Sequence, residues 1–156
     1  MTTTKKILAP LSGKIITLKN VPDPVFAEKL TGDGLAIKAE CNTVLAPCDG
    51  EITLFFDTKH AFAVTTPEGI QVLVHIGLNS IILNGEGLTA LKQLGDKVKA
   101  GEPVLQIDCD LCQKRDIDMI SPVLIVNHER TADLACTAEN TPVTAGQDTI
   151  ITYKAK

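Results

Sequence analysis

Leu8–Ile16 reads LAPLSGKII, and Leu45–Thr53 reads LAPCDGEIT. The two stretches align at an offset of 37 residues, and each places a turn at Pro and Gly before residues that favour a strand. A second pair, Gly32–Lys38 and Lys59–Thr65, aligns at an offset of 27, so the first copy contains ten additional residues around Val21–Leu30. Two copies are too few for a solenoid, and they predict a duplicated β unit whose halves pack together.

The rest of the chain also favours short strands, which Gly or Pro separates about every ten residues, as in sandwiches and barrels. Helical periodicity is confined to two short segments, Leu88–Leu94 and Asp110–Arg115. We therefore expect an all-β fold, an antiparallel β-sandwich or barrel built from a duplicated β unit with only short helical turns. We expect one domain over residues 7–156 after a short disordered leader of residues 1–6. The predicted strands are Ile7–Leu8, Gly13–Leu18, Gly34–Lys38, Thr43–Leu45, Gly50–Phe56, His60–Thr65, Gln71–Ile76, Lys97–Val98, Pro103–Ile107, Ser121–Val126 and Ile150–Tyr153.

The composition narrows the class of function. Hydrophobic residues make up 44% of the 156, and the net charge is −4 without a basic run, so nucleic acid is a poor partner. The start of the chain lacks the apolar stretch of a signal peptide, and no run approaches the length of a membrane span. We expect a cytoplasmic protein without a membrane anchor.

The five cysteines suggest no chemistry. An odd count without a secretion signal disfavours a disulfide framework. Cys109 and Cys112 form a C-x-x-C motif, but neither a thioredoxin-like βαβ unit nor a second pair of zinc ligands accompanies it. We interpret them as small side chains in the first turn of a short helix that Asp108 caps.

Two of the three histidines fall on a predicted hairpin. His60–Thr65 and Gln71–Ile76 flank the stretch 66–69, TPEG, in which Pro and Gly suit a type I turn. In a symmetric hairpin His60 faces His75, with Cβ atoms about 5 Å apart, whereas a one-residue bulge breaks this arrangement. Thr58 lies two residues before His60, on the same face, where its hydroxyl can hold the tautomer of the imidazole. His128 lacks such a setting and is interpreted as a surface loop residue.

The two faces of this hairpin differ in composition. One face carries Ala61, Ala63, Ile70, Val72 and Val74, which predict core. The other face carries Phe62 and Leu73 with both histidines, a mixture that predicts a docking surface. Two opposed imidazoles can bind a metal, or one can carry chemistry while the other assists, and the alternative for each is a satisfied structural histidine.

At these residues the chain resembles a known family, the glucose-type enzyme IIA of the bacterial phosphoenolpyruvate-dependent sugar phosphotransferase system. The resemblance runs from about Ile7 to Asn127 and rests on several motifs in the right order. These motifs are LAPLSGKII, VPDPVFAEKLTGDGLAIK, APCDGEI, TKHAFAV, VLVHIGL, LNGEG and GDKVKAGEPV.

The resemblance implies a phosphocarrier, a phosphotransferase component that works through phosphohistidine. His75 matches the histidine that is phosphorylated at Nε2, His60 matches the second active-site histidine, which supports the phosphoryl group, and Thr58 matches the residue that orients it. The implied donor is the histidine-containing phosphocarrier protein, and the implied acceptor is a cysteine of a IIB domain of a sugar permease. No cofactor is required, although in some relatives the two histidines complete a zinc site with a carboxylate of a regulated partner, which makes His60 and His75 conditional metal ligands.

The resemblance also implies a partner-binding patch, and the chain departs from the family in three respects, one of which is its five cysteines. The matching positions are Asp23, Val25, Phe26, Leu30, Phe56, Leu73, Asn79 and Ile81. Asn79 stands where the family usually has Asp, which keeps hydrogen bonding and loses charge. Only about six residues precede the fold, whereas some relatives carry a longer amphipathic leader, so we expect no membrane binding.

Two other functions stay open. A zinc hydrolase on a similar sandwich needs three protein ligands and a general base, and the sequence offers two histidines without an H-x-H or H-E-x-x-H motif. A regulatory binding module without chemistry is the other alternative, and the phosphocarrier prediction partly contains it, because relatives bind other proteins according to their phosphorylation state.

Overall fold

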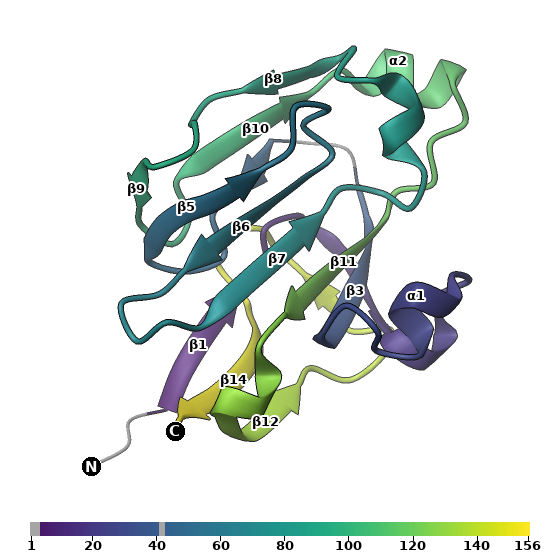
Figure 1. Ribbon diagram of the computed structural model, residues 1–156. Helices are drawn as coiled ribbons and strands as arrows, with labels where there is room; N and C mark the ends of the chain where they lie inside the picture. Colours follow the sequence, from purple (N-terminus) through teal and green to yellow (C-terminus); the bar gives the residue numbers. More distant parts are fainter. Residues whose placement is uncertain (1–3, 41–42) are drawn as a thin grey trace.

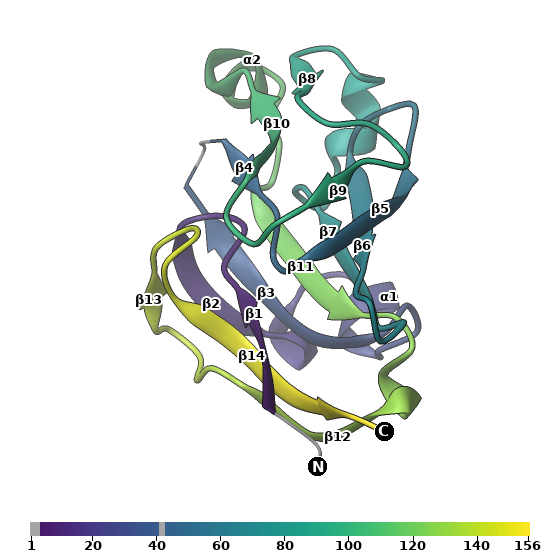
Figure 2. The same cartoon turned by 90° about the vertical axis from the view of Figure 1, so that its left-hand side faces the viewer.

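The computed structural model describes residues 4–40 and 43–156 and consists mainly of antiparallel strands in three sheets. The large sheet has the order β13-β2-β3-β11-β7-β6-β5-β9, and two three-stranded sheets have the orders β1-β14-β12 and β4-β10-β8. In Figure 2 the β1-β14-β12 sheet lies at the lower end of the molecule and the β4-β10-β8 sheet at the upper end. The strands are β1 Thr4–Leu8, β2 Gly13–Thr17, β3 Asp33–Ala39, β4 Val44–Leu45, β5 Gly50–Phe55, β6 Ala61–Thr65, β7 Gln71–His75, β8 Leu88–Ala90, β9 Lys97–Val98, β10 Pro103–Ile107, β11 Ile120–Ile125, β12 Thr131–Cys136, β13 Pro142–Val143 and β14 Thr149–Ala155.

The main core lies between the large sheet and the two small ones. It joins residues such as Ile15 and Ile37 of the large sheet to Ile7 and Ile151 of the β1-β14-β12 sheet, all fully buried. Aliphatic side chains from alternate strand positions fill this layer, so the sequence needs few aromatic residues. The predicted all-β sandwich is confirmed.

The internal repeat has a structural counterpart. Leu8 donates its amide to the Pro47 carbonyl at 2.8 Å, and Leu45 donates to the Pro10 carbonyl at 2.9 Å, so corresponding turns of the two copies bond to each other reciprocally. Gly13 and Gly50 are also equivalent, because a Cβ on either would lie 2.2 Å from a carbonyl oxygen of the neighbouring strand. The duplicated β unit therefore pairs its halves through the Pro–Gly turns.

A short outer layer covers part of the large sheet on the face away from the main core. The segment that interrupts the first repeat forms the 3₁₀ turn η1 (Leu18–Asn20) and the four-residue helix α1 (Pro24–Ala27), which lies beside β3 and β11 in Figure 1. Asp23 caps α1 through a hydrogen bond from the Val25 amide at 3.0 Å, and Pro24 suits the first helical position. Leu18, Val21 and Phe26 bury themselves in this layer against side chains of the sheet such as Ala36, Ala63, Leu73 and Leu124.

Several sequence predictions are wrong in detail. Thr4–Lys6, expected in a disordered leader, form the first part of β1 and pair with β14; residues 1–3 lie outside the described residues. Leu88–Leu94 begins with strand β8 rather than a helix, because Leu88 pairs with Ile107. The short strands β12 and β13 were not predicted at all.

The second predicted helical turn is confirmed as α2 (Cys109–Lys114). The Asp108 carboxylate accepts from the Leu111 amide at 3.1 Å and caps it as expected. Cys48, Cys112 and Cys136 are free thiols, whereas Cys109 is disulfide-bonded, so the interpretation of Cys109 as a small helix side chain without further chemistry is wrong. Cys41 lies outside the described residues. Over residues 4–40 and 43–156, no helix is both long and apolar enough to cross a membrane.

Two further short 3₁₀ turns complete the structure. They are η2 (Ser80–Leu83), which follows the hairpin that carries the histidines, and η3 (His128–Arg130), which follows β11. The predicted surface position of His128 agrees with its place in η3, a turn without buried residues.

Candidate functional site

The hairpin of β6 and β7 has a different register from the one that the sequence predicted. Ala61 pairs with His75, and Thr65 pairs with Gln71. The turn begins as expected, with the Gly69 amide donating to the Thr66 carbonyl at 2.9 Å, but Gly69 has a φ of +88° and adds one residue. This is a type I turn followed by a bulge, a common three-residue hairpin connection.

The extra residue changes which side chains of β6 face the core. Phe62 and Val64 are fully buried in the main core, whereas Ala61 and Ala63 lie on the outer face. The prediction had placed Ala61 and Ala63 in the core and Phe62 on the outer face, and it is wrong because a shift of one residue exchanges the faces of a strand. For β7 the prediction is confirmed: Val72 lies in the main core and Leu73 in the outer layer.

The two histidines are nevertheless close together. Their ring centroids are 5.3 Å apart, in a T-shaped arrangement with an interplanar angle of 73°. His60 lies just before β6, at a bend that follows Lys59 in the left-handed conformation with a φ of 59°. Its carbonyl accepts from the Ile76 amide at 2.8 Å, which continues the hairpin register. The bend, rather than a symmetric hairpin, therefore brings the two rings together.

His75 is held in one orientation. Its Nδ1 donates to the Gly77 carbonyl oxygen at 2.5 Å, and its ring meets the edge of Phe26 with centroids 5.2 Å apart. A carbonyl oxygen can only accept, so Nδ1 carries the proton of the neutral ring and the lone pair is on Nε2. The hydrogen bond thus leaves Nε2 of His75 as the ring nitrogen with a lone pair.

His60 is fixed from two sides. Its Nδ1 is hydrogen-bonded to the Thr58 hydroxyl, and its ring stacks on Phe56 with centroids 4.8 Å apart and an interplanar angle of 23°. When the hydroxyl donates to Nδ1, the ring proton is on Nε2, where it can serve a ligand near His75. The predicted proximity of Thr58 and His60 is confirmed geometrically.

Both imidazoles are biased toward their neutral forms. Burial lowers the pKa of His60 below its ordinary value. The pKa of His75 is lowered mainly by burial and further by repulsion from His60, while the Gly77 carbonyl and the negative charge of Asp23 oppose the shift. At neutral pH the lone pair of His75 is therefore available.

Aromatic side chains contact both histidines, Phe56 on His60 and Phe26 on His75. Val25, Leu30, Phe56 and Ile81 are exposed, Leu30 by 71% and Ile81 by 55%, which is unusual for large apolar residues. Phe26 and Leu73, also predicted to be in the patch, are buried instead, in the cluster between the outer layer and the large sheet.

The two polar residues of the predicted patch have partners within the chain. The Asp23 carboxylate is half-buried and caps α1. The Asn79 side chain accepts from the Asp118 amide at 2.8 Å and donates to the Asp116 carbonyl at 3.3 Å. An aspartate could make only the first of these two bonds, so Asn79 ties its loop to the segment that precedes β11.

The site offers too few donors for a metal of its own. Among the described residues, no group of three or more His, Cys, Asp or Glu side chains is arranged to hold a metal ion. Because Nδ1 of both rings is hydrogen-bonded, Nε2 of His60 and Nε2 of His75 are the two ring nitrogens left to coordinate a metal. A tetrahedral zinc ion would need further ligands from another molecule.

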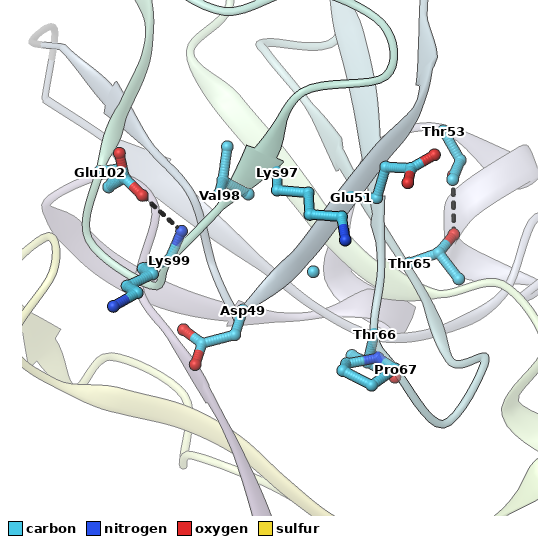
Figure 3. A pocket seen from close by; sticks show the side chains of 11 residues that line it. Asp49, Glu51, Thr53, Thr65, Thr66, Pro67, Lys97, Val98, Lys99 and Glu102 are labelled. Atoms are coloured by element: carbon cyan, nitrogen blue, oxygen red, sulfur yellow. Dashed lines mark hydrogen bonds between the residues drawn. The ribbon is translucent and has the colours of Figure 1, made fainter.

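A separate pocket of about 600 Å³ lies at the other end of β5 and β6 (Figure 3). Acidic and basic side chains alternate around it, including Glu51 and Lys97, which sit on paired residues of β5 and β9. The hydroxyls of Thr53 and Thr65 bond to each other at 2.7 Å, which uses one of their two O–H groups. The pocket includes neither histidine, and it does not contribute to the site.

Sequence reasoning missed two residues of the site. Gly77 was quoted only as part of the VLVHIGL motif, although its carbonyl orients His75. Ser121 was quoted only as the start of a strand, although it bonds to Gly77 across the sheet. A glycine two residues after a histidine at the end of a strand is the only local signal, and Ser121 has none.

The fold and the site define a class of protein, a β-sandwich that carries two adjacent imidazoles, each in contact with an aromatic side chain. Comparison with known proteins gives the family. Residues 5–131 match the model of the phosphoenolpyruvate-dependent sugar phosphotransferase system, EIIA 1. A PTS system glucose-specific EIIA component of Borreliella burgdorferi is 41% identical over 133 residues, which are 85% of this chain and 70% of that protein.

Other comparisons agree. A PTS system N-acetylglucosamine-specific EIICBA component of Klebsiella pneumoniae is 38% identical over 99% of this chain and 24% of that protein. The solved structure of glucose permease IIA from Mycoplasma capricolum has a TM-score of 0.86 at 33% identity, over 96% of each chain. The chain therefore belongs to the EIIA 1 family and is a phosphotransfer component of the sugar phosphotransferase system.

Proposed function

We propose that this chain accepts a phosphoryl group on Nε2 of His75 from the histidine-containing phosphocarrier protein and transfers it to a cysteine of a IIB domain of a sugar permease. The observation that carries this proposal is the hydrogen bond from Nδ1 of His75 to Gly77, with the ring of His60 5.3 Å away. This hydrogen bond leaves a lone pair on Nε2 of His75, and His60 is the neighbouring group that can donate a hydrogen bond.

The transfer consists of two successive displacements at phosphorus, one that loads His75 and one that unloads it. The Nε2 lone pair attacks the phosphorus of the donor's phosphohistidine, an N–P bond forms, the donor's N–P bond breaks, and its electron pair returns to the donor nitrogen. The proton of His75 stays on Nδ1, shared with the Gly77 carbonyl. In the second step the acceptor thiolate attacks phosphorus, the S–P bond forms, and the electron pair of the broken N–P bond returns to Nε2.

His60 supports the phosphoryl group in this scheme. A ring N–H from Nε2 can donate to a phosphoryl oxygen, and the bond is stronger when the ring is protonated. Thr58 keeps that nitrogen facing His75 through its own bond to Nδ1. The loss of the phosphoryl group to water is limited by the apolar surroundings, chiefly Phe26 and Phe56.

The exposed apolar residues around the histidines suit docking of partner proteins rather than a small molecule. Val25, Leu30 and Ile81 lie on the surface, where a partner can cover them during transfer. The related proteins are named for glucose, N-acetylglucosamine and glucoside, and we assign the choice of sugar to the permease. We place the reaction in the cytoplasm, without a membrane anchor on the described part of the chain.

Binding of regulated proteins is a further part of the proposal. His60 and His75 together would supply two of the ligands of a zinc ion whose remaining ligands include a partner carboxylate. Zinc would stabilise such a complex by joining the two surfaces, whereas phosphorylation of Nε2 would remove one ligand. No cofactor is needed for the transfer itself.

The proposal is tested by following the transfer of phosphate. With phosphoenolpyruvate, enzyme I and the phosphocarrier protein, the chain is expected to take up one acid-labile phosphate. His75→Gln is expected to take up none, and His60→Gln is expected to be phosphorylated but to pass the group to a IIB domain poorly. Normal uptake by His75→Gln would contradict the assignment of the nucleophile, and normal onward transfer by His60→Gln would contradict its supporting role.

A further inference from the structure

The Gly77 peptide is confined by its surroundings. Its φ is +66°, a left-handed conformation that favours glycine. A Cβ at this position would lie 2.6 Å from the Asp118 carbonyl oxygen and 3.2 Å from Cγ2 of Ile117. The backbone of Gly77 therefore rests directly against the segment that leads into β11, and this contact limits where its carbonyl can point.

A buried serine takes up the amide of this glycine. The Gly77 N–H donates to Oγ of Ser121 at 2.9 Å, and the Ser121 hydroxyl donates to the Met119 carbonyl at 2.9 Å. Ser121 is fully buried on β11, two residues before Val123, which forms the last backbone pair between β11 and β7. The side chain of Ser121 thus continues the attachment of the β7 strand to β11 where the backbone ladder stops.

The residues after Gly77 are anchored to the same segment. The Leu78 amide donates to the Asp118 carbonyl at 2.9 Å, and Oδ1 of Asn79 accepts from the Asp118 amide at 2.8 Å. The carbonyl of Gly77 lies between these attachments and the Ser121 bond. The Gly77 carbonyl belongs to the same peptide as the Leu78 amide, and the Gly77 amide belongs to the peptide before it. Because both peptides are anchored, the rotations about the Gly77 Cα are restricted and the carbonyl points toward Nδ1 of His75.

We propose that Ser121 is a positioning residue for the reaction at His75: by holding the amide of the Ile76–Gly77 peptide, it fixes the rotation about the Gly77 Cα, keeps the Gly77 carbonyl on Nδ1 and so keeps the free lone pair on Nε2. Ser121 touches neither a reactant nor the imidazole, and it acts through Gly77. The effect on the rate of transfer rests on the proposed function, whereas the effect on the tautomer of His75 does not.

The physical consequence of removing the hydroxyl is specific. In Ser121→Ala the Gly77 N–H stays buried without its acceptor, an arrangement that folded proteins avoid. The Ile76–Gly77 peptide relieves this by turning, which changes the φ of Gly77 and so displaces His75, on the far side of this peptide, relative to the Gly77 carbonyl. Neutral His75 then loses its preference and populates the tautomer with the proton on Nε2, which has no lone pair there for attack.

The experiment uses the full chain labelled with ¹⁵N in its histidines, at about pH 8, where the rings are neutral. Ring nitrogen shifts are expected to report a single Nδ1–H tautomer of His75 in the wild type and a mixture in Ser121→Ala. Ser121→Thr keeps the hydroxyl and is expected to restore the single tautomer. The rate of phosphoryl uptake is expected to fall about tenfold in Ser121→Ala and to recover in Ser121→Thr.

Thr66→Val provides a matched control. The Thr66 hydroxyl is also buried and also accepts from a turn amide, that of Ile70 at 3.1 Å, but at the far end of the same hairpin. Its loss is expected to lower the unfolding midpoint without changing the tautomer of His75. If Ser121→Ala does not fold, Ser121→Cys, whose sulfur is a weaker acceptor, is expected to show a smaller shift in the same direction.

The outcomes separate this inference from the proposed function. A single Nδ1–H tautomer of His75 in Ser121→Ala would overturn the positioning role. Equal changes in the tautomer population of His75 in Ser121→Ala and Thr66→Val would overturn it as well. A tautomer change in Ser121→Ala together with a wild type that accepts no phosphoryl group would support the positioning of His75 and contradict the proposed function.

Discussion

Phe26 joins the outer layer of the sandwich to the ring of His75, so its removal should affect both. The side chain is 6% exposed and is buried with Leu18 and Val21 against the outer face of the large sheet. Replacing a buried phenylalanine by alanine usually costs about 3–5 kcal/mol of stability. Helix α1 has only four residues and no stability of its own, so we expect Phe26→Ala to release α1 locally and the main core to persist.

Phe26→Ala should change two properties of His75. Burial is the main cause of its lowered pKa, so exposure of the ring should move the pKa up toward the ordinary value of 6.5. A phosphoryl group on Nε2 should also be lost to water faster, because Phe26 no longer covers the ring. An NMR titration of the ring nitrogens and the half-life of the phosphorylated protein measure the two effects.

Phe55→Ala is the matched control for this experiment. Phe55 packs against Phe62 of the main core, with ring centroids 5.8 Å apart, and on the other face of the sheet from Phe26. We expect it to lower stability without moving the pKa of His75. An unchanged pKa in Phe26→Ala, or equal shifts in the two variants, would refute the idea that the outer layer tunes this histidine.

Three further predictions concern the orientation, the backbone and the charge of the site. Thr58→Val removes the partner of His60 Nδ1, and we expect normal phosphoryl uptake but an onward transfer to IIB slowed about three- to tenfold in single-turnover assays; an unchanged rate would contradict a role of the hydroxyl. Gly77→Ala places a Cβ 2.6 Å from a backbone oxygen, whereas nothing lies within 4 Å of a Cβ at Gly101. Left-handed strain alone should cost Gly101→Ala ~1–2 kcal/mol of unfolding free energy, and Gly77→Ala should lose more in urea denaturation. Equal losses would contradict the close approach. Because folding lowers the pKa of both His60 and His75, the unfolded chain binds protons first as the pH falls below about 6.5, so stability should decline there and level off below the folded pKa values. The double variant His60→Gln/His75→Gln should show a smaller decline, and an identical pH profile of unfolding would contradict the lowered pKa values.

The sequence alone predicted much of the fold because its signals are local and repeated. The Pro–Gly turns of Leu8–Ile16 and Leu45–Thr53 recur at a fixed offset, and the structure pairs them through reciprocal backbone bonds. Strand β12 carries no such signal, because it is mostly exposed or half-buried and Asp133 interrupts its pairing in a left-handed conformation. Helix α1 is too short to show a helical period.

The candidate site shows where local reasoning stops. The sequence predicted that His60 and His75 meet, and they do, but through a bend at Lys59 rather than through the symmetric hairpin that was assumed. The bulge at Gly69 was the specific feature that a turn motif could not distinguish from a plain type I turn. Ser121 lies 44 residues from Gly77 along the chain, and only the pairing of β7 with β11 brings the two together.

The most direct test of the account is to locate the phosphoryl group in the phosphorylated wild-type chain. Phosphorus–nitrogen couplings in the ¹⁵N-histidine-labelled protein identify both the residue and the ring nitrogen. The account predicts a single phosphoryl group on Nε2 of His75, with Nδ1 still protonated and bonded to the Gly77 carbonyl. A phosphoryl group on Nδ1 of His75, or on His60 or His128, would contradict it.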